Sequence, residues 1–163
     1  MIALQIRHLK EFMNKLLLQD TFDHFLVSEA SITTFATFTV DGEFHPDFYS
    51  SEEAAAPGTA GRTQALWREV KPFCLSVIRG KRAPLSFKFV FQLPREEVAL
   101  LTAKSSPDLS ADDVFGLYLN CHYNGEILTL TTGSSLRLFT LDKSLDNAWD
   151  DLLQEFLRLQ DID

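Results

Sequence analysis

The stretch LSFKFVFQL, residues 85–93, decides the fold prediction, because apolar and polar side chains alternate along it. Successive side chains of a β-strand point to opposite faces, so this alternation predicts a strand with one buried and one exposed face. Such a strand is typical of an antiparallel sheet that is covered on one side. The apolar positions are Leu85, Phe87, Phe89, Phe91 and Leu93.

Helices are predicted on both sides of this strand. Residues 64–79 carry apolar side chains at helical spacing, although a proline at position 72 predicts a kink or two short helices. Gly80 suits a left-handed cap at the end of this segment. Pro94, followed by Glu96, favours a second helix directly after the strand. The apolar positions of the first helix are Leu66, Val70, Phe73, Cys74 and Val77.

The remaining segments repeat one order of elements twice. Residues 2–6 predict a strand, residues 9–17 a helix and residues 22–49 further strands. After the helix at Pro94, residues 114–141 predict three strands, and a terminal helix begins near Ser144. We therefore predict an α+β fold of two βαβββ-like halves with antiparallel sheets, a linking helix and a C-terminal helix. Residues 1–163 are expected to form a single domain.

Turn chemistry sets the expected boundaries of the strands. Asp41-Gly42, Asn124-Gly125 and Gly133-Ser134 each predict a chain reversal, because glycine tolerates positive φ. Residues 32–40 are placed in one strand that ends at the first of these turns. Residues 50–63, SSEEAAAPGTAGRT, are small and polar and predict a flexible loop. The terminal helix is expected to bury Leu145, Ala148, Trp149, Leu152, Phe156 and Leu159 and to expose Asp146, Asp150, Asp151 and Glu155.

The composition describes a folded, acidic chain with few cysteines. Hydrophobic residues make up 45% of it, which predicts a sizeable core rather than disorder, and the formal net charge is −8. Cys74 and Cys121 are too few for a disulfide scaffold and predict buried, reduced thiols. The N-terminal residues lack the apolar core of a signal peptide, and no run of about 18 apolar residues occurs. We expect a cytoplasmic protein that does not bind a membrane.

Positive charge is concentrated in one segment of this acidic chain. Residues 62–88 hold seven Lys and Arg residues and a single acidic residue, Glu69. On a helical projection of residues 64–79, the basic side chains lie opposite the apolar positions. The residues expected to bind an anionic partner are Arg68, Lys71, Arg79, Lys81 and Arg82.

Three roles for this basic surface stay open. A non-enzymatic binding module would use it for nucleic acid or for an acidic protein partner. A homo-oligomer would place the acidic terminal helix of one copy on the basic helix of another. The third explanation is that the charges only solvate the helix, as charge runs commonly do.

Signatures of catalysis and of metal binding are missing from the sequence. The turn TTGSSLR, residues 131–137, lacks the spacing of a nucleophile elbow. A small hydrolase with a site in loops 105–113 and 133–135 is the remaining enzyme hypothesis. His45 and Asp47 are a candidate ligand pair, but no zinc or calcium spacing accompanies them. We therefore expect neither a metal nor another cofactor.

Two resemblances add to this prediction. The segments EFMNKLLLQDTFDHFLVSEASITTF (11–35), GKRAPLSFKFVFQLP (80–94) and FTLDKSLDNAWDDL (139–152) resemble an uncharacterised family of short bacterial proteins. That resemblance covers most of the chain except residues 50–63, and it implies no functional residue. The doubled βαβββ order is also similar to one domain of the DNA sliding clamps, which implies a clamp-like arrangement of the two halves.

Overall fold

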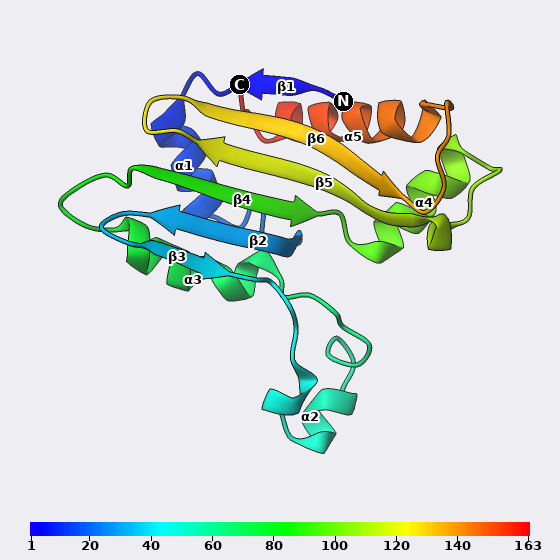
Figure 1. Cartoon of the computed structure of the whole chain (residues 1–163), viewed down its shortest axis with the longest axis horizontal. Coiled ribbons are helices and arrows are strands. Elements are labelled where there is room, and N and C mark those ends of the chain that lie inside the picture. The colour runs from blue at the N-terminus through cyan, green and yellow to red at the C-terminus, as the bar shows by residue number, and fades with distance from the viewer.

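The computed structural model describes all residues 1–163 and contains one open, six-stranded antiparallel sheet (Figure 1). The strand order is β1-β6-β5-β4-β2-β3, so β1 and β3 form the two edges. The predicted α+β class with antiparallel pairing is thereby confirmed. The strands are β1 (Ala3–Gln5), β2 (Leu26–Thr33), β3 (Thr37–Val40), β4 (Ser86–Gln92), β5 (Val114–Tyr123) and β6 (Leu128–Leu136).

Four of the five α-helices lie behind the sheet in Figure 1, and α2 lies apart below β3. None of the helices combines the length and the apolar character needed to cross a membrane. The helices are α1 (Leu9–Leu17), α2 (Ser51–Ala55), α3 (Trp67–Ile78), α4 (Arg95–Ser105) and α5 (Ser144–Leu159), and two short 3-10 helices cover Pro46–Phe48 and Ala111–Asp113.

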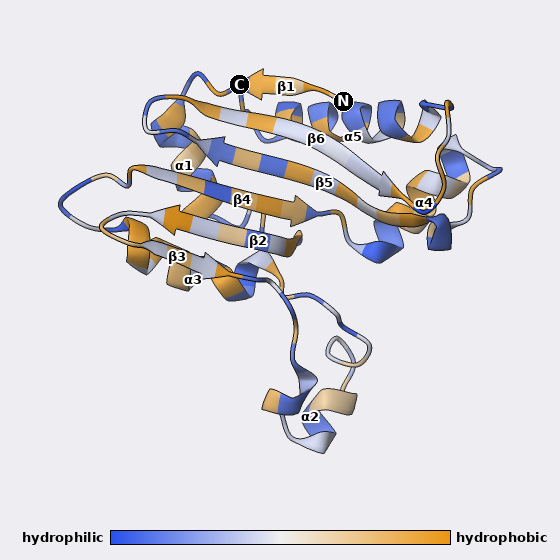
Figure 2. Ribbon diagram, viewed as in Figure 1, coloured by the Kyte–Doolittle hydropathy of each residue, from blue (hydrophilic) through white to orange (hydrophobic).

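The alternation that opened the sequence analysis places the core as predicted. Phe87, Phe89 and Phe91 of β4 are buried beneath the helices, and the indole of Trp67 from α3 lies 5.0 Å from the Phe89 ring centroid. Figure 2 shows the same alternation as orange and blue or pale segments along β4 and β5. Lys88 of β4 pairs in register with His122 and is exposed, so the opposite face of the sheet is polar.

Two of the three predicted turns, Asp41-Gly42 and Gly133-Ser134, are wrong. The hairpin between β2 and β3 turns at residues 34–36, where the Thr34 amide donates to the Ala36 carbonyl, so residues 32–40 are not one strand. Gly133 pairs with Tyr118 inside β6 and closes no turn. The Asn124-Gly125 turn is confirmed, because its asparagine Oδ1 accepts two backbone amides and the glycine has φ +102°.

Each half of the chain has one strand fewer than predicted and reads βαββ. Beyond β3, Pro46 starts a 3-10 helix, and proline cannot donate to a strand ladder. Beyond β6, residues 137–143 are irregular until α5 begins. The chain therefore departs from the βαβββ order that underlies the comparison with sliding clamps.

The linking helix differs from prediction in two details. Helix α3 continues through Pro72 instead of dividing into two short helices. It ends at Arg79 in extended geometry, and Gly80 does not adopt the left-handed conformation that the prediction assigned to it. The backbone therefore leaves α3 directly toward β4.

The buried side of α5 is rotated relative to the predicted stripe. Leu153 and Leu157 are buried, whereas the predicted core position Leu152 is exposed. Asp150, predicted to be exposed, is buried and accepts a hydrogen bond of 2.5 Å from the Thr132 hydroxyl. The N-terminal ammonium lies 2.8 Å from the same carboxylate, so a polar network joins α5 to the sheet.

Candidate interaction surface

The five basic residues predicted to bind a partner do not form one cluster. Arg68 lies in the first turn of α3, whereas Arg79 ends that helix. The helical rise between these two residues corresponds to about 16 Å. Lys81 and Arg82 follow in the connection to β4 and therefore lie at the end of α3 far from Arg68.

Three cations of the basic segment, Arg62, Lys71 and Lys88, form ion pairs within the fold, the last of them with Glu29 at 3.9 Å. The Lys71 ammonium lies 2.6 Å from the Asp23 carboxylate and ties α3 to the segment after α1. Arg62 donates to both carboxylate oxygens of Glu69 and lies 4.2 Å from the centroid of the Phe44 ring. These hydrogen bonds from Arg62 hold the pKa of the Glu69 carboxyl below its ordinary value. Lys71 and Arg62 therefore stabilise the fold.

The basic turn, which we define as residues 79–84, carries three of the four cations of the segment that form no ion pair. The fourth, Arg68, is exposed in the first turn of α3. Arg79, Lys81 and Arg82 are exposed, and none forms an ion pair or a side-chain hydrogen bond. The amide of Leu85 donates to the carbonyl of Thr33 at 2.8 Å, which fixes the turn beside the tip of the β2–β3 hairpin. The end of the basic turn is thereby held beside Thr33, which pairs with Thr37 at the start of β3.

Strand β3 is an open edge with apolar side chains on its inner face. Phe38 pairs in register with Ile32, and Val40 pairs with Ala30. Both partners are buried beneath the helices, and residues directly opposite in a ladder share a face. Helix α3 packs across β2 and leaves the Phe38 side chain 40% exposed.

A shallow apolar groove of about 260 Å³ continues this inner face toward α3. Phe73 projects into it and is 70% exposed, which corrects the prediction that it faces the core with Val70 and Cys74. Helical spacing did not separate these positions, since Phe73 adjoins the buried Cys74 in sequence. The groove is lined by Val40, Phe44, Tyr49, Ala65, Glu69, Val70 and Phe73.

An arm, which we define as residues 45–61, leaves the C-terminal end of β3 and extends below the edge of the sheet in Figure 1. It contains α2, whose Ser50 hydroxyl accepts the Glu53 amide while the Glu53 carboxylate accepts the Ser50 amide. Part of the predicted loop 50–63 is therefore helical. None of the arm residues is buried, and the Phe48 side chain is 85% exposed.

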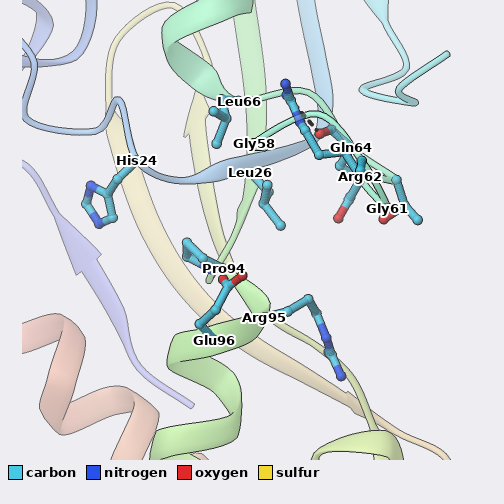
Figure 3. A pocket seen from close by; sticks show the side chains of 12 residues that line it. His24, Leu26, Gly58, Gly61, Arg62, Gln64, Leu66, Pro94, Arg95 and Glu96 are labelled. Atoms are coloured by element: carbon cyan, nitrogen blue, oxygen red, sulfur yellow. Dashed lines mark hydrogen bonds between the residues drawn. The ribbon is translucent and has the colours of Figure 1, made fainter. Parts of the chain in front are cut away.

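A cavity of about 420 Å³ lies between the last residues of the arm and the start of α4 (Figure 3). His24 stands at one side of it, and the guanidinium of Arg95 points away from Arg62. Arg95 donates to the carbonyls of Ala111 and Val114. The lining of the cavity includes His24 and Glu96 but no serine, cysteine or aspartate.

Side chains in the two loops of the enzyme hypothesis pair with residues outside those loops. Ser134 donates to Asp146 at 2.5 Å, and Asp113 pairs with Arg137, whose hydrogen bonds lower the pKa of that carboxyl. No histidine lies among the residues lining the 300 Å³ hollow beside Ser134. The arrangement of serine, histidine and acid that activates a serine nucleophile is therefore not assembled at this hollow.

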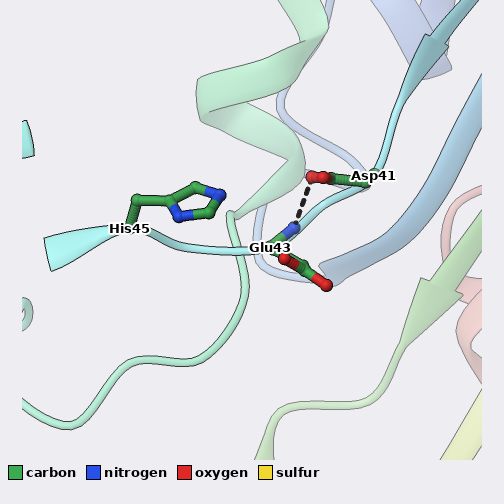
Figure 4. Close-up of side chains that lie close together, drawn as sticks. All are labelled: Asp41, Glu43 and His45. Atoms are coloured by element: carbon green, nitrogen blue, oxygen red, sulfur yellow. Dashed lines mark hydrogen bonds between the residues drawn. The ribbon is translucent and has the colours of Figure 1, made fainter.

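The candidate ligand His45 lies near Asp41 and Glu43 (Figure 4). One ligand atom of each of these three residues lies within 4.8 Å of the others. All three side chains are exposed, and the Asp41 carboxylate accepts the Glu43 amide. Exposed groups of this kind commonly remain without a metal, so the geometry assigns no ion to them.

Comparisons with known proteins place the chain in a family. Neither the curated proteins nor the solved structures gave a match. A family model, described as a family of unknown function (DUF5721), matches residues 15–163, which include every element from the end of α1 to the C-terminus. The match covers far more than half of the chain. The chain therefore belongs to this family of unknown function.

Proposed function

We propose that this chain is a non-enzymatic binding module that captures an acidic protein segment at the basic turn and the adjoining edge of β3. The observation that carries the proposal is the position of three unpaired cations, Arg79, Lys81 and Arg82, beside the hairpin that leads into the open strand β3. We further infer a cytoplasmic, bacterial setting; the buried free thiols Cys74 and Cys121 support a reducing compartment.

The surface favours an extended polypeptide over nucleic acid. An edge strand offers backbone hydrogen bonds, and a groove beside it accepts alternate side chains, which is the recognition mode of strand addition. Val40 of β3 and Phe73 of α3 line such a groove, and Phe38 extends the apolar inner face of β3 beyond it. Asp41 and Glu43 lie at the other end of the same edge and would repel phosphates, as would the net charge of −8.

Fluorescence anisotropy tests the proposal with a fluorescein-labelled ten-residue peptide of alternating glutamate and valine. Arg79→Ala/Lys81→Ala/Arg82→Ala should weaken binding at least tenfold. The matched control, Arg7→Ala/Lys10→Ala/Lys104→Ala, removes three exposed cations elsewhere and should bind normally. Equal loss in both variants, or tighter binding to a 20-base-pair duplex with affinity falling steeply as salt rises, would contradict the proposal.

A further inference from the structure

We infer that the acidic segment is the arm of a second copy of this chain. Two copies pair antiparallel through their β3 edges about a two-fold axis, and each arm lies on the basic turn of the other copy. This inference rests on the proposed function, since it assigns the partner of the same surface. It differs from the predicted oligomer, in which α5 supplied the acidic contact.

The charges at the two ends of the edge are complementary. The arm carries Asp47, Glu52 and Glu53 and no Lys or Arg, whereas the basic turn carries three cations and no acid. None of these six side chains forms an ion pair. The arm leaves β3 at its C-terminal end, and the basic turn lies beside the hairpin that leads into its N-terminal end. Antiparallel pairing therefore brings the acidic arm of one copy to the basic turn of the other, and it does so at both ends of the interface.

The backbone of β3 is prepared for such pairing. The Thr33 carbonyl is directed to Leu85 and hence toward β4, so the pair Thr33–Thr37 lacks mutual hydrogen bonds in the β2–β3 ladder. By the alternation of an antiparallel ladder, the amides of Thr37 and Thr39 face the open edge. With Thr39 on the two-fold axis, the Thr39 backbone of one copy exchanges hydrogen bonds with the Thr39 backbone of the other copy.

The same register buries the exposed apolar side chains. Phe38 of one copy then lies opposite Val40 of the other on the inner face, because directly opposed residues share a face. Phe73 flanks this row from α3, and Phe35, 93% exposed at the hairpin tip, lies 5.7 Å from Phe38 between ring centroids. A two-fold interface of this kind therefore covers the exposed apolar row of β3.

Three of the four acids of α5 have partners within the fold, and only Asp151 is exposed without an ion pair. Asp150 is buried against Thr132, Asp146 accepts from Ser134, and Glu155 pairs with Arg158, which lowers the pKa of that carboxyl. Binding the basic turn would require these carboxylates to leave their present partners. The arm acids have no ion pairs to break.

Sedimentation velocity with charge-reversed variants tests the inference. We expect a dimer at about 50 μM for the unmodified chain, and monomers for Arg79→Glu/Arg82→Glu and for Asp47→Lys/Glu52→Lys. Both variants retain the Ser50–Glu53 cap of α2. Mixing them should restore a dimer, because each copy then offers an arm and a turn of opposite sign to its partner. Lys10→Glu/Lys104→Glu is the matched control and should remain dimeric.

A proline at the edge tests the strand pairing separately. Thr39→Pro removes only an outward-facing amide, which an edge strand tolerates, and should give a monomer with an unchanged circular dichroism spectrum. Thr39→Ala should remain dimeric. An unmodified chain that is monomeric at 200 μM, or a dimer that survives both charge reversals and the proline, would overturn the inference. If that monomer still binds the acidic peptide through the basic turn, the proposed function stands without a second copy.

Discussion

At the scale of single residues, Gly42 occupies a position that no other residue fits. It has φ +75°, and a Cβ built there would lie 2.1 Å from the carbonyl oxygen of Val27 in β2. Gly58 of the arm has a similar φ of +85° and open space around it. A substitution at Gly42 therefore adds steric overlap with the sheet to backbone strain, whereas a substitution at Gly58 causes backbone strain alone.

We expect Gly42→Ala to destabilise the fold by more than about 3 kcal/mol, since the β2 backbone must move as well as the strained residue. Gly58→Ala should cost about 1 kcal/mol, because only the left-handed conformation is penalised. Urea denaturation of both variants gives the two free energies of unfolding. Equal losses would mean that the segment after β3 shifts without cost to β2.

The buried thiols make stability depend on alkaline pH. Burial raises the pKa of Cys74 to about 12 and raises that of Cys121 as well. In the unfolded chain a thiol ionises near pH 8.5, so the unfolded state releases protons that the folded state keeps. The stabilising contribution of the neutral thiols is complete below about pH 8.5 and declines as the pH rises toward 12.

We expect Cys74→Ala to flatten this decline by about 1.4 kcal/mol per pH unit above pH 8.5. Free energies of unfolding in urea at pH 8, 9 and 10 give the slopes for the variant and the unmodified chain under reducing conditions. Tyrosines and lysines titrate in both proteins, so the difference between the slopes isolates one thiol. Identical slopes would show that Cys74 reaches solvent in the folded state.

At the scale of secondary structure, the network of Thr132 and Asp150 attaches β1 and α5 to β6. The Thr132 hydroxyl donates to the Asp150 carboxylate and accepts the amide of Ile2 at 3.0 Å. Thr132→Val keeps the shape of the side chain and removes both hydrogen bonds. The buried carboxylate then loses a donor, which typically costs about 1–3 kcal/mol.

Thermal or urea unfolding of Thr132→Val measures this loss, which should exceed that of Ser134→Ala. Ser134 is the matched control, since it also bonds a carboxylate of α5, Asp146, but does so at the exposed surface. A loss no greater in Thr132→Val than in Ser134→Ala would show that the amide of Ile2 and the Asp150 carboxylate find water instead.

The sequence predicted the elements that depend on local pattern. Alternation in β4, the Asn124-Gly125 turn and the start of α5 at Ser144 are all found in the structure. The hairpin at residues 34–36 was missed, because its residues, Thr34-Phe35-Ala36, carry none of the usual turn chemistry. The alternation of side chains also runs on through these three residues, so the pattern predicted a single strand.

The candidate surface was predictable only in its charge. The excess of basic residues in 62–88 was visible in the sequence, but the pairing of Lys71 with Asp23 depends on contacts between distant segments. The exposed Phe38 could not be predicted, because its exposure follows from the edge position of β3. Strand order in a sheet is set by the packing of the whole chain.

At the scale of the whole molecule, the two sheet edges provide an internal comparison. Strands β1 and β3 both have one unpaired side, yet only β3 adjoins the basic turn and the arm. Open edges are liable to pair with other chains, and proteins commonly protect them with charges or with covering segments. The association inferred above protects β3 and leaves β1 open.

Hydrogen exchange measured at about 1 μM and at about 100 μM should distinguish these edges. The amides of Thr37 and Thr39 should exchange at least tenfold more slowly at the higher concentration, because pairing with a second copy occupies them. The amides of β1, as the internal control, should exchange at the same rate at both concentrations, as should all amides of Thr39→Pro. Protection confined to the arm would indicate a contact between arm and basic turn without strand pairing. Concentration-dependent protection of β1 in place of β3 would contradict the assignment of the interface, since the charges that select β3 lie at the other side of the sheet.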